Sequence, residues 1–140
     1  MNIKDFLKIL DSAKRWDHNI NYQENPMLYL YTECCGGMYT CKPYSKELLG
    51  MYKFLGRGAS EKTANNLYSY FLKKVKDSDF VGADLSRKYI QSAMNKRTIS
   101  SASRAVFANF YSMVEKNEGY IFLKKDFLDR KQELKATKKK

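Results

Sequence analysis

Apolar residues recur every three or four positions over most of the chain, a spacing that places them on one face of an α-helix. Between residues 61 and 76, for example, Ala64, Leu67, Phe71 and Val75 share such a face, and polar residues fill the other side. The helices predicted in this way span residues 3–13, 44–52, 61–76, 80–94, 120–134 and a segment that ends at Glu115 after a cap at Ser100 or Ser101.

One segment departs from the helical pattern. Residues 28–34 and 38–42 are rich in aromatic and β-branched residues, and Gly36 and Gly37 between them tolerate the positive φ of a tight turn. We therefore expect a small antiparallel β-hairpin at this point. The expected fold class is α+β: mainly α, with about five helices and this one hairpin.

The length of 140 residues is usual for one domain, and the charge balance is unusually basic. We expect a single compact domain over residues 1–134 and a disordered, Lys-rich tail over residues 135–140. The chain has 26 Lys and Arg against 15 Asp and Glu, which gives a net charge of +11. Residues 42–104 alone hold thirteen basic and five acidic side chains, net +8, so the excess lies in the expected domain and favours anionic partners.

The basic excess follows the long predicted helices, and we interpret it as a phosphate-binding face. On a helical wheel, Asp84, Arg87, Lys88 and Gln91 lie opposite the apolar stripe of their helix, where a ligand could reach them. An ordinary solvated basic surface is the alternative explanation. The residues assigned to the nucleic-acid-binding face are Lys73, Lys74, Arg87, Lys88, Gln91, Lys96, Arg97 and Arg104, with Lys76 beside them.

A second anion-binding candidate is the segment Gly56-Arg57-Gly58-Ala59-Ser60, at the start of a predicted helix. Free backbone N–H groups at a helix start attract anions, and the Arg57 guanidinium adds further donors, so Arg57, Gly58 and Ser60 are the candidate residues. A plain turn with Ser60 as the helix N-cap explains the same residues. The segment is not a P-loop, because the required Lys-Ser or Lys-Thr pair is absent.

The cysteines and the single histidine form no metal or catalytic pattern. Cys34 and Cys35 are adjacent and Cys41 stands apart, so no CxxC pair exists, and we expect free thiols, no metal and no cofactor. His18 follows Asp17 without a nucleophile placed beside it, so we expect a protein that is not an enzyme. Free thiols and the lack of a signal peptide favour an intracellular protein, in the cytoplasm or nucleus of a host or in a virion.

The eleven tyrosines allow two interpretations. Tyr29, Tyr31 and Tyr39 alternate along the expected hairpin, where rings beside Lys and Arg could stack on nucleic-acid bases. Tyr68 and Tyr89 lie on apolar helical stripes, so we expect them in the core.

The segment DFVGADLSRKYIQSAM, residues 79–94, resembles the best-marked block of a family of small uncharacterised proteins of bacteria and tailed phages. Members of that family look like DFVGMDMARKFLQMG at this point, and the shared mark is Asp-Phe-Val-Gly-x-Asp. The similarity continues upstream from Tyr22 through residues 43–54, and downstream through residues 103–107 and 120–124. It therefore covers most of the chain in order.

The resemblance implies no activity, because the family is a domain of unknown function. Asp79 as a helix N-cap and Gly82 as a point of close helix packing explain the start of the block without any ligand. After the block the family has a Thr-Arg-Ala-Arg-Arg run, of which this chain keeps only Lys96, Arg97 and Thr98.

Two functions of different classes follow from these observations. The first is a non-enzymatic, nucleic-acid-binding or nucleic-acid-associated protein of a virus or bacterium. The alternative is a viral or phage interaction protein that binds and modulates an acidic host protein through the same positive surface. An enzyme acting on a nucleotide or a phosphorylated substrate comes third, and no membrane partner is expected because no apolar run is long enough to span a bilayer.

Overall fold

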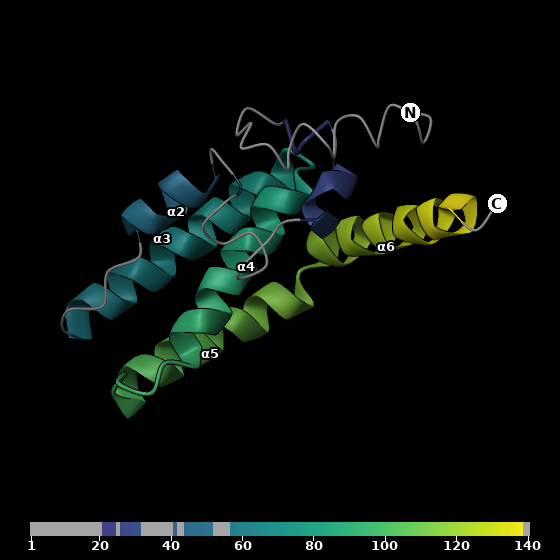
Figure 1. Ribbon diagram of the computed structural model, residues 1–140. Coiled ribbons are helices and arrows are strands. Elements are labelled where there is room, and N and C mark those ends of the chain that lie inside the picture. The colour runs from purple at the N-terminus through teal and green to yellow at the C-terminus, as the bar shows by residue number, and fades with distance from the viewer. Residues whose placement is uncertain (1–20, 25, 32–40, 42–43, 52–56, 139–140) are drawn as a thin grey trace.

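The computed structural model describes residues 21–24, 26–31, 41, 44–51 and 57–138, and this part of the chain is all-α (Figure 1). Its elements in chain order are the 3-10 helix η1 (Pro26–Tyr31) and the α-helices α2 (Tyr44–Met51), α3 (Arg57–Lys76), α4 (Phe80–Met94), α5 (Ser101–Lys116) and α6 (Glu118–Lys138). None of these helices is long and apolar enough to cross a membrane.

The expected α+β fold with a hairpin is wrong, because no strand occurs in the part of the chain that the structure describes. Pro26–Tyr31, which includes the start of the first expected strand, forms η1 instead. The turn at Gly36 and Gly37 lies outside the described residues, as does the second expected strand up to residue 40.

The reason for this error lies in how Tyr29 becomes buried. Tyr29 is 6% exposed, and its ring packs edge-on against Phe80 and Phe127. Aromatic residues favour strands because a sheet offers them a half-buried surface, not because the backbone requires it. Here helices α4 and α6 supply that surface, so a short 3-10 turn satisfies the same residues.

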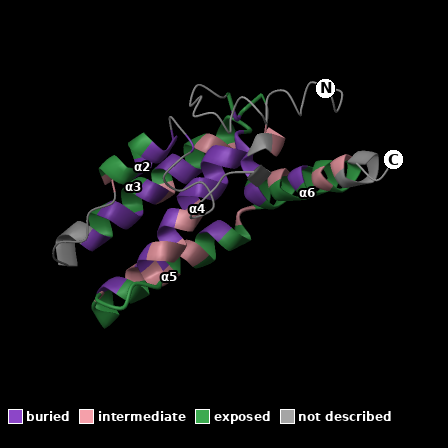
Figure 2. Cartoon of the chain, viewed as in Figure 1, coloured by how far each residue is buried: buried purple, intermediate pink, exposed green. Residues whose placement is uncertain are grey.

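The core lies where α3, α4 and α5 pack against one another, with α2, η1 and α6 at its edges (Figures 1 and 2). Tyr89 is fully buried in it, as predicted, whereas Tyr68 is half-buried and stacks on Phe71. The largest fully buried side chains are Tyr89, Tyr120, Phe71, Phe107, Leu48 and Leu67. Toward its C-terminal end α6 extends away from the other helices (Figure 1).

The predicted helix 80–94 is confirmed, and its start is fixed by a side chain. Asp79 is the N-cap of α4, and its carboxylate accepts a hydrogen bond from the Gly82 backbone N–H at 3.2 Å. The turn before it is tight enough to hold Ser78 at a φ of +57°. A Cβ atom on Gly82 would lie 2.8 Å from the Lys74 side chain and 3.0 Å from Tyr44, so glycine lets α2, α3 and α4 approach closely.

The other helix ends agree with the sequence only in part. Ser100 caps α5, as predicted, and accepts a hydrogen bond from the Ser103 backbone N–H. Ser60 is not an N-cap, because α3 already begins at Arg57 and Ser60 lies inside the helix with 1% exposure. Helix α6 runs to Lys138, four residues into the stretch expected to be a tail.

Replacing Asp79 should destabilise the fold more than a surface change in the same turn. Asp79→Ala is expected to lower the free energy of unfolding by about 2–4 kcal/mol, because the N-cap is removed and the buried Tyr44 hydroxyl, now 2.6 Å from Asp79 Oδ2, loses its acceptor. Asp79→Asn keeps one acceptor oxygen, which can still receive the Gly82 N–H bond of the cap, and should lose less. Urea unfolding followed by circular dichroism measures both, with the exposed Asp77→Ala as control. Equal losses for Asp77→Ala and Asp79→Ala would contradict the cap.

Candidate functional site

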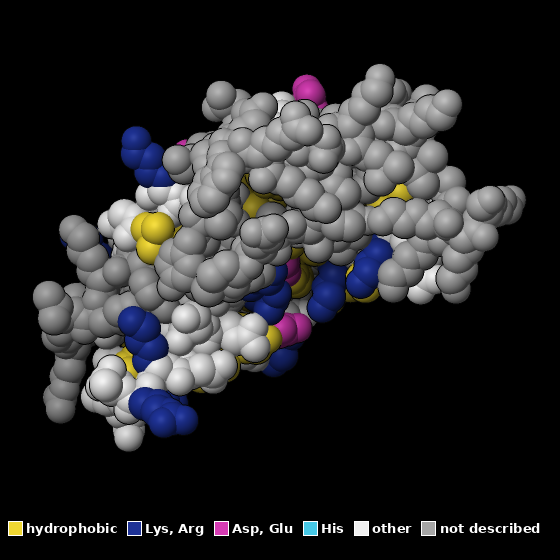
Figure 3. Space-filling view, viewed as in Figure 1, with side chains coloured by type: hydrophobic (Ala, Val, Ile, Leu, Met, Phe, Trp, Pro, Cys, Tyr) yellow, Lys and Arg dark blue, Asp and Glu magenta, His cyan; other side chains and the backbone are white. Residues whose placement is uncertain are grey.

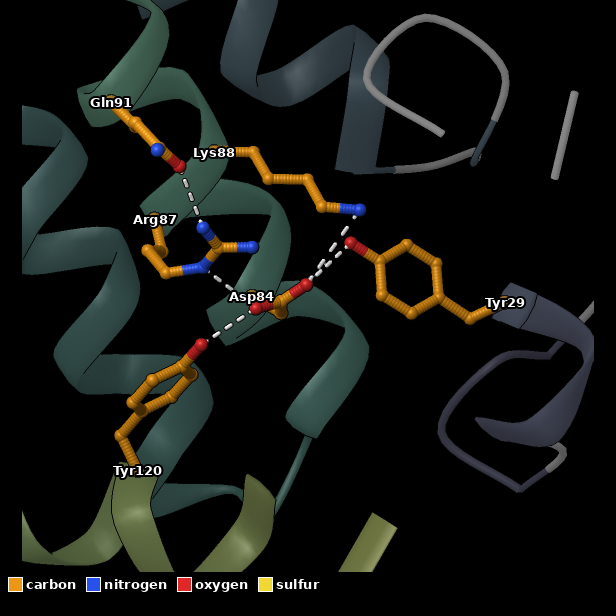
Figure 4. Close-up of polar contacts among 6 residues, drawn as sticks. All are labelled: Tyr29, Asp84, Arg87, Lys88, Gln91 and Tyr120. Carbon is orange, nitrogen blue, oxygen red and sulfur yellow. Dashed lines mark hydrogen bonds and ion pairs between the residues drawn. The ribbon is translucent and has the colours of Figure 1, made fainter. Parts of the chain in front are cut away.

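The most concentrated polar chemistry of the described fold surrounds Asp84, in the second turn of α4. Asp84 is only 6% exposed although it carries a carboxylate. Figure 4 shows it between Tyr29 of η1 and Tyr120 of α6, with Arg87 and Lys88 above it on α4. We call these residues, together with Gln91, the Asp84 network.

Three donors point at the Asp84 carboxylate at short distance (Figure 4). The Tyr29 hydroxyl donates to Oδ2 and the Tyr120 hydroxyl to Oδ1, each at 2.6 Å. The Arg87 Nε–H group also donates to Oδ1, at 2.8 Å. The carboxylate therefore joins η1, α4 and α6, three elements that are far apart in the sequence.

The cationic members of the network contact other side chains of the fold. Arg87 donates its Nη1–H group to Gln91 Oε1 at 2.7 Å, and 18% of its side chain is exposed. The Lys88 ammonium lies 3.7 Å from Asp84 Oδ2 and 4.3 Å from the centre of the Tyr29 ring, a cation–π contact. On this helix Asp84 is buried, contrary to the expected open face, whereas Arg87 and Gln91 are partly exposed and their contact with a ligand stays a prediction.

Asp84 and Arg87 form a charged pair in this network, and Tyr29 and Tyr120 are neutral phenols. Burial would raise the pKa of Asp84, but the hydrogen bond and charge of Arg87 and the two tyrosine hydroxyls outweigh burial, so the pKa of Asp84 lies below its ordinary value of 3.8. Burial lowers the pKa of Arg87, but the bond to Asp84 outweighs it and raises that pKa. Burial and the adjacent carboxylate raise the pKa of both Tyr29 and Tyr120. Burial lowers the pKa of Lys88, whose longer contact with Asp84 compensates less.

Lys74, another predicted phosphate ligand, is also held inside the fold. Its ammonium lies 5.4 Å from the ring centre of Tyr44 and 5.1 Å from that of Tyr70. The Tyr70 hydroxyl in turn donates to Glu47 at 2.6 Å. Lys74 therefore bridges α2 and α3, and its aliphatic stem packs against Gly82 of α4.

The remaining predicted cations are exposed, but they lie in two separate places. Lys73, with the neighbouring Lys76, is at the end of α3 that leads into the start of α4. Lys96, Arg97 and Arg104 are exposed at the opposite end of α4, roughly 20 Å away at 1.5 Å per residue. An Arg104 Nη2–H group donates to the Lys96 backbone carbonyl at 3.0 Å, which draws these residues together. We call Lys96, Arg97 and Arg104 the corner cluster.

The corner cluster lies within a long stretch that contains no carboxylate, a signal that the sequence analysis missed. From residue 85 to residue 114 the chain has five Lys or Arg and no Asp or Glu. In Figure 3 the surface over the α4–α5 connection and the adjoining end of α5 shows Lys and Arg side chains but no acidic ones. Packing of α4 on α5 therefore brings a stretch whose charged side chains are all positive to this end of the bundle.

The second anion-binding candidate gains no support from the structure. Ser60 is buried inside α3, where its hydroxyl cannot cap the helix start. The side chain of Arg57 and the surroundings of Gly58 lie outside what the structure describes. The three candidate residues Arg57, Gly58 and Ser60 are therefore not brought together as an exposed cradle in the described part of the chain.

Within the described residues, no group of three or more His, Cys, Asp or Glu side chains could hold a metal ion. Cys41 is a buried cysteine. Burial raises the pKa of the Tyr22 phenol, and the neighbouring Cys41 raises that pKa further. Cys34, Cys35 and His18 lie outside the described residues.

Comparison with known families gives one match. The model of a domain of unknown function, DUF4385, matches residues 13–100, more than half of the chain. The chain belongs to the DUF4385 family. No curated protein and no solved structure matches it.

The DUF4385 match covers most of the Asp84 network but not all of it. Tyr29, Asp84, Arg87, Lys88 and Gln91 lie inside the matched region, as do Lys96 and Arg97 of the corner cluster. Tyr120 and Arg104 lie beyond it, on α6 and α5. In this DUF4385 protein, helices outside the matched region thus complete both groups of residues.

Removing the Asp84 charge should destabilise the protein in a pH-dependent way. At pH 7, Asp84→Asn is expected to lower the free energy of unfolding by about 3–5 kcal/mol, because it leaves the Arg87 charge half-buried without its partner. The folded-state pKa of Asp84 lies below the unfolded value, so the carboxylate stabilises the fold fully above about pH 5, and this contribution is lost as the pH falls below 3.8. The difference in unfolding free energy between the parent and Asp84→Asn should therefore shrink by up to about 1.4 kcal/mol per pH unit below 3.8.

Denaturant unfolding at pH 7, 5 and 3 measures this gap. The control is Asp126→Asn, which removes an exposed ion pair with Arg130 and should change stability by less than about 1 kcal/mol. A gap that is the same at all three pH values would show that Asp84 is not ionised in the folded protein.

Proposed function

We propose that this protein binds nucleic acid and that the corner cluster of Lys96, Arg97 and Arg104 makes its phosphate contacts. The observation that carries the proposal is that these three cations are exposed and close together in a stretch of the chain without any carboxylate. Phosphate contacts from exposed Lys and Arg supply most of the affinity of sequence-independent nucleic-acid binding.

The proposal reassigns the cations of the predicted face. Arg87, Lys88 and Gln91 belong to the Asp84 network, and Lys74 is held between two tyrosine rings, so their first role is to hold helices together. Lys73 is exposed, but it lies at the end of α3, beside the start of α4 and far from the corner cluster. It would therefore contact only a ligand that extends along the length of α4.

Replacing the corner cluster should weaken binding to every nucleic acid by a similar factor. For Lys96→Ala/Arg97→Ala, the slope of log K against log salt on duplex DNA should fall by about 0.9 for each phosphate that the variant no longer neutralises. The unfolding free energy should change by less than about 0.5 kcal/mol per residue, since both side chains are exposed. Fluorescence anisotropy at several salt concentrations measures the affinity and its slope.

The matched control is Lys124→Ala/Lys125→Ala on α6, which removes the same charge from an exposed site. If both double variants lower the slope equally, net charge alone drives binding and the corner cluster is not the site. If the parent binds no nucleic acid at low salt but binds an acidic protein, the alternative function replaces this one.

A further inference from the structure

The outer side of α5 starts at the corner cluster and is covered by no other described helix. At 100° per residue, Ser101, Ala105, Asn109 and Ser112 lie on one side of the helix, with Arg104 at its margin. All five are exposed. We call this side, residues 101–112, the outer face of α5.

The orientation of this face is fixed by the packing on the other side of the helix. Ser103, Phe107 and Val114 are buried, and Phe110 packs against Tyr68 of α3. Ser100 anchors the first turn through its bond to the Ser103 N–H. The outer face is therefore part of a packed helix and not of a loop. A helix holds the side chains of a binding surface in more precise positions than a loop does.

The chemistry of the outer face suits one class of partner. Its side chains are short, so the helix backbone could approach a groove closely, and Arg104 and Asn109 carry the donors and acceptors that pair with guanine and adenine edges. The Ala105 methyl group is of the kind that contacts the methyl group of thymine. No Asp or Glu occurs between residues 85 and 114, and the exposed Glu115, about one turn beyond Ser112 on the same side, marks the C-terminal limit of the surface that a phosphate backbone can approach.

We propose that α5 binds duplex DNA by lying in the major groove, with Lys96 and Arg97 on the phosphates at its N-terminal end. This inference rests on the proposed nucleic-acid binding and adds the kind of nucleic acid and the element that enters it. The B-form major groove is about 12 Å wide and admits an α-helix. The three turns from Ser101 to Ser112 extend about 16 Å, enough to cross it.

Two other nucleic acids fit this surface less well. The major groove of an RNA duplex is deep and narrow, and a helix cannot enter it. Single strands are gripped by platforms of several aromatic rings, whereas the outer face of α5 has only the half-buried Tyr111 at its margin beside Arg104, because Phe107 is buried and Phe110 packs on α3. Duplex DNA is the partner whose shape and charge complement the face.

The first experiment compares three probes of one mixed sequence: a DNA duplex, the corresponding RNA duplex and one DNA strand. We expect the DNA duplex to bind tightest. Dimethyl sulfate methylates guanine N7 in the major groove and adenine N3 in the minor groove, so the bound protein should protect guanine N7 and leave adenine N3 reactive. Equal affinity for the three probes, or no protection of N7, would overturn the major-groove proposal while leaving phosphate binding intact.

The second experiment places a negative charge on the face. Ala105→Glu and the nearly isosteric Asn109→Asp should each weaken DNA-duplex binding at least about tenfold through repulsion of the phosphates. The matched control is Ser69→Glu, an exposed position on α3 with the same change in charge, which should weaken it far less. Unfolding curves verify that each variant is folded. If Ser69→Glu weakens binding as much as Ala105→Glu, the outer face is not the interface, and if the parent binds none of the probes, the proposed function itself fails.

Discussion

The carboxylate of Asp84 lies inside the described helices, where an unpaired charge would cost several kcal/mol. It is tolerated because Arg87 neutralises it and the hydroxyls of Tyr29 and Tyr120 complete its hydrogen bonds. Arg87 lies on α4 itself, but the two tyrosines come from η1 and α6, so the hydrogen bonds of the carboxylate are complete only when these three elements have assembled. The interaction thereby selects one arrangement of the helices, and its loss leaves a charged donor and two phenols without an acceptor.

This requirement gives the polar residues of the block at residues 79–94 a structural role. Asp79 caps α4, Gly82 admits Lys74 and Tyr44, and Asp84 holds Arg87, which in turn holds Gln91. These polar positions of the block have their partners inside the protein. The cations whose exposure lets them meet phosphate lie beyond the block, in the corner cluster, and α5 carries that surface onward.

Features set by neighbours in the sequence could be predicted, whereas features set by distant partners could not. The bounds of α4 and the cap at Ser100 follow from local periodicity and local hydrogen bonds, and the structure confirms both. Tyr29 was assigned to a strand because nothing near it in the sequence reveals that α4 and α6 bury it. The helical wheel places Asp84 on the polar side of α4, but only the positions of Tyr29 and Tyr120 show that Asp84 itself is buried.

The ionisation of Asp84 in the folded protein tests this account most directly. Its carboxyl carbon can be followed by nuclear magnetic resonance as the pH is lowered from 7, with the signal assigned through Asp84→Asn. The account predicts that the signal stays at the ionised position below pH 3.8 until the protein unfolds. A carboxyl group that gains its proton at or above its ordinary value would contradict the buried ion pair on which the arrangement of the helices depends.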